Sequence, residues 1–458
     1  MFDTRLNSNL PQRRLDGLEL LRDLERRFRN ARDPLERAQL ADRLVPELVS
    51  NDEADKAFAV LAGIEEYGVD FESRARLLAL RAVVDAMHGQ SPAADIAAAL
   101  HLLPSLSGPA AAVVRHRAGV ASFHARNALD AEEHSLAALA LCERYGMRWL
   151  GARTASTLYG VYYHLTGDLN SARFYAELAT SQADAAGDTA VRRAYWCAQY
   201  DLACVFADWD RAGSLRQLLR RDRGHEAYST TLPTRIADSL MLGRSGDFAA
   251  MRGRLESLGE TATNTADRSL VLALLAVAMA GTGSKPEARS AARRALGLSN
   301  IEAANDERVF LTVRRRLAGA LAAWISVIVG DTYHGMRALG VRAKWHGSVG
   351  ALAGAFESEA RGLSIDSTNP SLAPVRGYLA VAQRARLGML ALETIMPYAL
   401  TGTELDVLRA VAQGRSNAAI ALERGVTRNA IERRLMSAYE KLDVHTRGEA
   451  IAKISRLL

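Results

Sequence analysis

A turn recurs about every 38 residues along this chain, and the stretches between the turns have a helical pattern. Apolar residues between 15 and 360 follow helical spacing and are interrupted by Gly, Asp or Asn. The predicted turns lie near Asp52, Ser91, Asp130, Asp168, Asp208, Asp247 and Ser284. Two helices fit between successive turns, and such a hairpin is too small to bury its own apolar face. The sequence therefore predicts an all-α fold in which helical hairpins stack as an α-solenoid.

The unit at 152–187 has the clearest pattern. Its first helix carries Leu158 and Val161 on one side, and Gly167 and Asp168 form the turn. Glycine tolerates the left-handed conformation that ends a helix, and aspartate caps the helix that follows. Alanines on the second helix allow close helix packing. These units resemble tetratricopeptide repeats over roughly residues 50–345, in the degenerate form of bacterial helical sensor domains.

Composition and the pattern of apolar residues divide the chain into three parts. Residues 1–361 are assigned to the solenoid, as a sensor or interaction domain. The second part is residues 362–397. Its first residues, 362–377, contain two prolines and three serines and show no helical pattern of apolar residues, so we expect a linker there. A connecting helix is expected to follow at 377–395. Residues 398–458 form the third part and have the strongest functional signal.

The third part has the spacing of a helix-turn-helix. Thr401 and Glu404 form a capping box, Gly414 ends the first helix, and Ser416 begins a short second one. Thr427 caps a third helix, and a last helix begins near Thr446. The apolar stripe of the third helix is Ile431, Leu435, Ala438 and Leu442. Its outward face has the side chains of a recognition helix that enters the major groove, namely Arg428, Asn429, Glu432, Arg433 and Met436.

This segment resembles the DNA-binding domain of LuxR/GerE-type transcription regulators. The matching positions include Leu400, Thr401, Glu404, Gly414, Ser416, Asn417, Ile420, Thr427, Ile431, Lys441, Leu442, Val444 and Arg447. The resemblance implies a four-helix domain that binds double-stranded DNA, and it implies RNA polymerase as a further partner. The predicted DNA-binding residues are Ser416, Asn417, Thr427, Arg428, Asn429, Glu432, Arg433, Arg434, Lys441 and Arg447.

Five positions depart from the family pattern. Thr403 replaces an arginine, Ala419 replaces a frequent glutamate, Ala430 replaces a hydroxyl residue, and Arg434 replaces a histidine. Glu432 lies where a basic residue is common. Its carboxylate has two candidate partners, a cytosine amino group and the Arg428 side chain four residues earlier. These departures affect the target sequence and the affinity rather than the fold.

The resemblance also implies a homodimer formed through the last helix. Its apolar face consists of Ala450, Ile451, Ile454 and Leu457. The alternative is that this stripe only closes the core of the four-helix domain.

Aromatic residues are concentrated between 145 and 209, within the solenoid. The predicted effector pocket consists of Trp149, Arg153, Tyr159, Tyr163, Tyr195, Trp196 and Gln199. A stacking pocket of this kind suits a sugar or an aromatic metabolite. The alternative is that the rings fill gaps between repeats. A sensor followed by a DNA reader resembles the layout of maltose-regulon-activator-type regulators, although this chain lacks a phosphate-binding loop, so no nucleotide cofactor is expected.

Composition limits the remaining classes. The chain has a formal charge of +6 and is 49% hydrophobic, which is typical of a soluble globular protein. The apolar stretches at 269–281 and 317–330 are too short to span a membrane and predict buried helices. Cys142, Cys197 and Cys204 predict buried thiols in the cytoplasm. The sequence has no catalytic motif and no metal-binding spacing, so we expect a DNA-binding regulator, most often an activator in this family, with a small-molecule or protein effector. A protein-interaction scaffold with secondary or lost DNA binding is the alternative.

Overall fold

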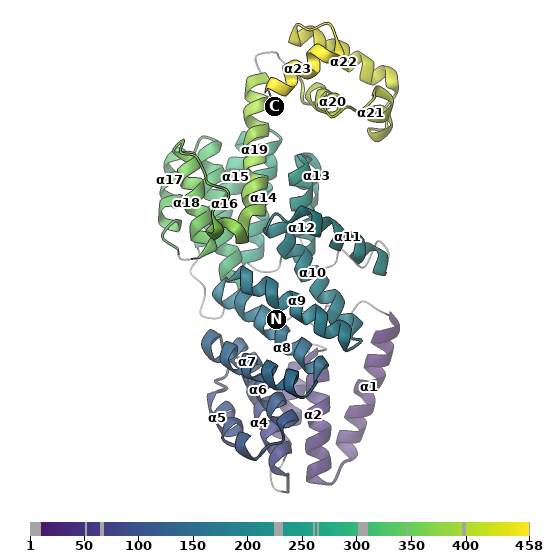
Figure 1. Cartoon of the computed structure of the whole chain (residues 1–458), viewed down its shortest axis with the longest axis vertical. Coiled ribbons are helices and arrows are strands. Elements are labelled where there is room, and N and C mark those ends of the chain that lie inside the picture. Colours follow the sequence, from purple (N-terminus) through teal and green to yellow (C-terminus); the bar gives the residue numbers. More distant parts are fainter. Residues whose placement is uncertain are drawn as a thin grey trace.

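A computed structural model describes residues 11–50, 53–64, 68–223, 232–259, 262, 265–300, 310–345, 347–395 and 400–457. Within these ranges the regular structure consists of helices α1 to α23 with short 3-10 and π segments, and it contains no strand. The helices stack along an elongated molecule, and the C-terminal helices lie at one end of it (Figure 1). The predicted all-α class is confirmed.

The N-terminal helices form a separate core. Buried leucines such as Leu24, Leu44 and Leu48 pack together there with Val84 from the fourth helix. The helices that contribute are α1 (Pro11–Asn30), α2 (Pro34–Ser50), α3 (Ala54–Ala62) and α4 (Phe71–Met87). This core is continued by the stacked hairpins.

Helical hairpins make up the remainder of the solenoid. Helix α4 pairs with α5 (Ala93–His101), which is followed by the short η2 (Leu103–Ser105). The next pairs are α6 (Gly108–His124) with α7 (Ala128–Arg144), α8 (Arg148–Gly160) with α9 (Leu169–Ala185), α10 (Thr189–Val205) with α11 (Trp209–Arg223), α12 (Leu232–Ser245) with α13 (Phe248–Gly259), α14 (Thr265–Gly281) with α15 (Lys285–Asn300), and α16 (Phe310–Ile328) with α17 (Thr332–Arg342). A π-helical segment, η3 (Val161–Thr166), extends α8. The predicted α-solenoid is therefore confirmed.

The turns within the hairpins have the predicted chemistry. Gly167 has a φ of 75°, and the Asp168 carboxylate accepts hydrogen bonds from two amides at the start of α9. Gly246 has a φ of 83°, and Asp247 accepts from the Ala250 amide at 3.0 Å. One turn differs, because Asn127 caps α7 and Asp130 lies within the first turn of that helix. Asp52 lies outside the described residues.

Contacts between neighbouring hairpins repeat at a fixed separation along the chain. The Tyr163 hydroxyl donates to Asp201 at 3.0 Å, and the Tyr200 hydroxyl donates to Asp238 at 2.8 Å. Each of these pairs is separated by 38 residues. This separation matches the period of the predicted turns, so the period reports how one hairpin stacks on the next.

The two long apolar stretches form buried helices, as predicted. Residues 269–281 belong to α14 and residues 317–328 to α16, and both helices have fully buried side chains, including Trp324. Cys142 and Cys204 are buried as predicted, whereas Cys197 is only half-buried. None of the helices in the described ranges has the length and the apolar character needed to cross a bilayer.

The segment expected to be a linker packs as part of the solenoid. It follows α18 (Ser348–Ala360) and contains η4 (Pro370–Val375), in which Leu372 and Val375 are buried. The predicted connecting helix is α19 (Arg376–Ile395), and it packs against α10, α12 and α14. Its side chains belong to the solenoid core (Tyr378, Leu379, Val381, Ala382, Ala385 and Met389). Pro370 begins η4 and the buried Pro374 lies within it, so the proline-containing segment is packed against the solenoid. Met396 and Pro397 lie outside the described residues.

Candidate nucleic-acid interface

Four C-terminal helices form a unit with its own core. They are α20 (Gly402–Ala412), α21 (Asn417–Glu423), α22 (Arg428–Leu442) and α23 (Arg447–Leu457). The predicted stripe of α22 is buried in full: Ile431, Leu435, Ala438 and Leu442. Helix α20 packs on α22 and α23, and α21 packs on α22. In Figure 1 this unit projects beyond the end of α19, with α22 far from the hairpins.

The starts of the first three helices follow the predicted capping chemistry. Thr401 and Glu404 form a capping box at the start of α20. Ser416 caps α21 through the Ala419 amide, and Thr427 caps α22 through the Ala430 amide. The turn between α21 and α22 contains Gly425, whose φ of 63° is a conformation that glycine adopts readily. The local sequence therefore sets where the two helices of the helix-turn-helix begin.

Glu404 joins α20 to α22 through a buried carboxylate. It accepts hydrogen bonds from Lys441 Nζ at 2.8 Å, from Ser437 Oγ at 2.7 Å and from the Thr401 amide at 2.7 Å. Burial alone would raise the pKa of Glu404, but these hydrogen bonds outweigh it and lower the pKa to about 2. The carboxylate stays ionised at neutral pH and holds the two helices in register.

Lys441 is thus occupied within the domain. Sequence reasoning placed it among the DNA-binding residues, but its ammonium group contacts both oxygens of Glu404. Arg447 is also occupied, because it donates to Asn417 Oδ1 at 2.8 Å and to the Arg415 carbonyl. These contacts tie α23 to the start of α21. Three predicted DNA-binding residues, Asn417, Lys441 and Arg447, therefore have contacts that support the domain.

The outward face of α22 carries the other predicted residues. Asn429 and Arg433 are exposed, and Met436 is 71% exposed. Arg428 Nε lies 2.7 Å from Glu432 Oε1. Of the two candidate partners of Glu432, the Arg428 side chain is therefore the one that it contacts in this structure. Because this pair neutralises itself, it adds little net charge to the face.

Arg433 and Arg434 are the cations of α22 that keep their charge uncompensated. Neither has an ion pair with the described residues, and Arg433 makes only a long hydrogen bond of 3.5 Å to the Asn429 carbonyl. Other arginines of the domain are paired, such as Arg415 with Glu423 and Arg424 with Asp406. The tertiary contacts therefore identify which cations of the domain are accessible.

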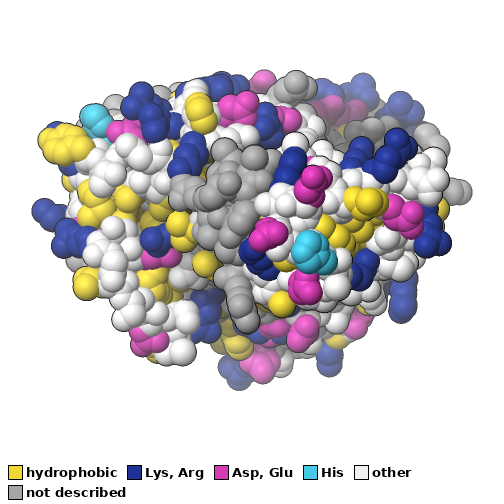
Figure 2. Space-filling model, turned by 90° about the horizontal axis from the view of Figure 1, so that it is seen from above, with side chains coloured by type: hydrophobic (Ala, Val, Ile, Leu, Met, Phe, Trp, Pro, Cys, Tyr) yellow, Lys and Arg dark blue, Asp and Glu magenta, His cyan; other side chains and the backbone are white. Residues whose placement is uncertain are grey.

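Charge on the end of the molecule that carries this domain is mixed. Figure 2 shows Lys and Arg side chains distributed over that face with Asp and Glu between them. A contact with a polyanion on this face therefore depends on the few unpaired cations of α22 rather than on a broad basic surface.

The predicted dimerisation stripe lies mostly inside the domain. Ala450 and Ile454 are buried in its core, and the half-buried Ile451 packs against it. The Leu457 side chain lies outside the described residues. Helix α20 packs on α23, so this stripe contributes to the core of the four-helix domain, and its role in dimerisation stays a prediction.

The predicted effector residues separate into two groups. Tyr159 stacks on Tyr163 at 5.4 Å between ring centroids and contacts Tyr195 edge-on at 5.7 Å, so these three rings fill space between α8, η3 and α10. Gln199 is buried and donates to Thr180 Oγ1 at 2.7 Å. The packing alternative therefore describes these four residues.

Trp149, Arg153 and Trp196 form the second group, nearer the surface. Trp149 is 51% exposed and lies under the Arg153 guanidinium at 4.2 Å. Trp196 has a similar partner in Arg192 at 5.0 Å. Arg192 was not among the predicted effector residues. It lies four residues before Trp196 on one helix, and this spacing could have predicted the contact between the two side chains.

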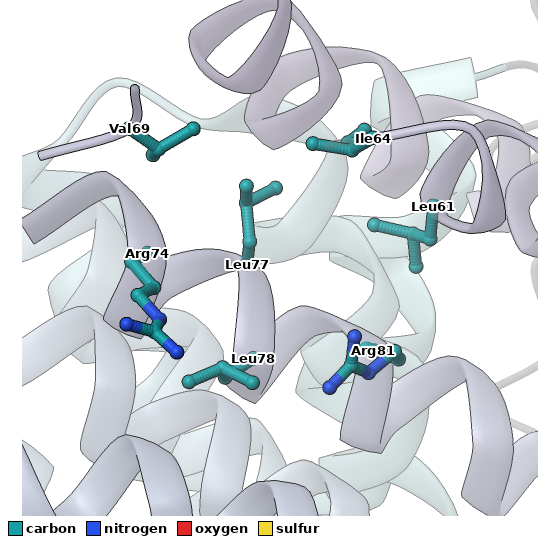
Figure 3. A pocket seen from close by; sticks show the side chains of 7 residues that line it. All are labelled: Leu61, Ile64, Val69, Arg74, Leu77, Leu78 and Arg81. Carbon is teal, nitrogen blue, oxygen red and sulfur yellow. The ribbon is translucent and has the colours of Figure 1, made fainter. Parts of the chain in front are cut away.

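A cavity elsewhere in the solenoid is too small for a metabolite. It has a volume of about 20 Å³, which is room for about one water molecule. Apolar side chains of α3, of α4 and of the segment between them surround it together with two arginines (Figure 3): Leu61, Ile64, Val69, Arg74, Leu77, Leu78 and Arg81. Arg81 is already paired with Asp95 at 2.6 Å.

Comparison with known proteins agrees with the C-terminal geometry. The family model of bacterial regulatory proteins of the luxR family matches residues 398–454. No curated protein matches the chain. Residues 398–454 therefore form a LuxR-family helix-turn-helix domain, and this domain supports a role of the protein as a DNA-binding transcription regulator.

Proposed function

We propose that α22 of this LuxR-family domain reads promoter DNA in the major groove, and that the solenoid controls this reading in response to an effector. The observation that carries the proposal is the outward face of α22, where the exposed Asn429 and Arg433 have no ion pair in the described structure. The half-buried Arg434 of the same helix also has none. Asparagine pairs with adenine, and arginine pairs with guanine or phosphate. Thr427 and Ser416, at helix N-termini, suit contacts with phosphates.

The test is a gel-shift titration of the full chain on duplexes selected from a random pool, repeated at several salt concentrations. Wild-type protein should prefer selected over scrambled DNA, with affinity falling steeply as salt rises. The double substitution Arg433→Ala and Arg434→Ala should weaken binding about ten- to a hundredfold and reduce the salt slope by about two.

A matched control removes the same kind of charge far from α22. Arg361 lies at the end of α18 and pairs with Glu357, so Arg361→Ala should leave DNA affinity unchanged. Equal affinity of wild type for selected and scrambled duplexes would overturn the proposal. It would favour the alternative, a protein-interaction scaffold whose DNA binding is secondary or lost.

The regulatory layout adds three expectations. We propose that the solenoid binds a small-molecule or protein effector, that the regulator activates transcription through contact with RNA polymerase, and that it acts as a homodimer in the cytoplasm. The exposed side of α23, which includes Gly448, Glu449 and Ala452, is the part of that helix open to a second copy. Light scattering of the full chain with and without DNA measures the oligomeric state, and a reporter assay measures the sign of regulation.

A further inference from the structure

We propose that the surface formed by Trp149 and Arg153 on α8 binds an aromatic carboxylic acid. This inference deepens the proposed sensor function and rests on it. Its basis is a guanidinium that lacks a carboxylate partner and lies on an exposed indole ring.

Arg153 differs from several arginines of the solenoid in its contacts. Arg314 donates to Asp267 at 2.5 Å, and Arg254 donates to Asp238 at the same distance. Arg153, in contrast, makes no side-chain hydrogen bond and no ion pair with the described residues, and its Nε atom is buried without a hydrogen-bond partner. The two Nη atoms are not among the buried atoms that lack a partner, so they remain open to solvent, and a bound carboxylate would accept hydrogen bonds from them.

Two carboxylates, Asp188 and Glu47, lie near Arg153 and act on its charge. Burial lowers the pKa of Arg153, and the nearby carboxylates of Asp188 and Glu47 only partly oppose that shift. Asp188 is engaged at the start of α10, where it accepts from the Val191 amide at 3.0 Å. Neither carboxylate forms an ion pair with Arg153 in the described structure, so its guanidinium has no carboxylate acceptor of its own.

The indole of Trp149 supplies the second half of the recognition. Its ring is 51% exposed, although Arg153 lies 4.2 Å from the ring centroid. An exposed indole beside a cation suits a flat, apolar ring that carries one carboxylate. The carboxylate would accept hydrogen bonds from Arg153 while the ligand ring packs on Trp149. On α10, Arg192 lies over Trp196, but Arg192 is already paired with Asp184 at 2.7 Å.

The experiment is a calorimetric titration of the full chain with benzoate, with benzamide as the neutral ligand of the same shape. Benzoate should bind saturably and benzamide should bind at least about tenfold more weakly, because a charge-assisted hydrogen bond is lost. Arg153→Gln and Trp149→Ala should each weaken benzoate binding about tenfold or more. Arg148→Gln removes an exposed charge next to the site and should leave binding unchanged.

Circular dichroism checks that each variant is folded. Trp149→Ala changes an exposed side chain and is therefore expected to fold, so it still tests the site if Arg153→Gln does not fold. Absence of saturable benzoate binding, or equal binding of benzamide, would overturn the site. DNA affinity of the unliganded protein is measured separately. Intact DNA binding without benzoate binding removes only this inference, whereas loss of sequence preference in DNA binding removes the proposed function.

Discussion

At the scale of single residues, buried charges decide which side chains support the fold and which remain accessible. Glu404 and Asp201 are both buried carboxylates, but their surroundings differ. Glu404 has a lysine and two hydroxyl groups around it, whereas Asp201 accepts from Tyr163 and shares Arg314 with Asp267. Their pKa values therefore move in opposite directions, and each direction gives a testable effect on stability.

Glu404→Gln should destabilise the DNA-binding domain by about 2–3 kcal/mol at neutral pH. The folded pKa of about 2 lies below the ordinary value of 4.5, so the carboxylate stabilises the fold above about pH 4.5 and loses that effect as pH falls toward 2. Amide hydrogen exchange of α20 to α22 in the full chain measures the change. Glu440→Gln, an exposed change on α22, should shift exchange by less than about 0.5 kcal/mol; equal effects of the two substitutions would contradict the assignment.

Asp201→Asn should stabilise the solenoid at neutral pH by about 1–3 kcal/mol. Burial raises the pKa of Asp201 to about 6, against the opposing effects of Arg314 and Tyr163. Because the ordinary value is 3.8, the folded state favours the protonated acid, and the cost of ionisation develops as pH rises from about 4 through 6. Asparagine keeps an acceptor for Tyr163 without the charge.

All five tryptophans lie in the solenoid, so their fluorescence during thermal unfolding reports this difference at several pH values. The gain from Asp201→Asn should disappear below about pH 4. Asp210→Asn, at an exposed position of α11, is the control and should show no such pH dependence. A loss of stability in Asp201→Asn at neutral pH would show that the electrostatic attraction between Asp201 and Arg314 outweighs the cost of burial.

At the scale of elements, the helix that precedes the DNA-binding domain, α19, packs closely against α10 of the solenoid. Gly377 lies against the backbone of α10, and a Cβ there would be 1.7 Å from the Cys204 carbonyl oxygen. Gly388, on the same helix, has its nearest contact at 3.5 Å from the Gly281 carbonyl oxygen. The first glycine is required by close packing, and the second is not.

Gly377→Ala should therefore lower the stability of the solenoid by about 1–3 kcal/mol or more, because the backbones must separate. Gly388→Ala should be neutral or stabilising by up to about 1 kcal/mol, since alanine favours helix. Urea unfolding of both variants, followed by tryptophan fluorescence, makes the comparison. Similar stabilities would show that α19 is not seated against α10.

At the scale of the whole molecule, we propose that the boundary of the solenoid lies after α19 rather than at residue 361, because α19 contributes to the solenoid core. A fragment ending at residue 361 lacks six side chains of the shared core, which α19 supplies. We expect residues 1–361 to aggregate and residues 1–395 to remain soluble, because only the second fragment covers the apolar surface of α10, α12 and α14. Size-exclusion chromatography of the two fragments distinguishes them, and equal behaviour would place the boundary at 361.

Much of this architecture follows from local chemistry. Helical spacing, the turn period near 38 residues and the caps at Asp168, Thr401 and Thr427 are properties of neighbouring residues, so the sequence alone predicted the hairpins and the helix-turn-helix. The buried stripe of α22 was predicted for the same reason. These features depend on contacts within a few turns of helix.

Only the tertiary structure decided which charges and rings remain accessible. Lys441 meets Glu404 across 37 residues, and Arg447 meets Asn417 across 30, so their spacing in sequence does not reveal the contact. Tyr163 and Trp149 belong to one helical unit, yet one ring is buried and the other exposed. The prolines and serines of residues 362–377 likewise predicted a linker, but Leu372 and Val375 of η4 are buried there, and the predicted helix α19 packs on α10, α12 and α14. Such long-range contacts depend on how the hairpins stack, which no local pattern records.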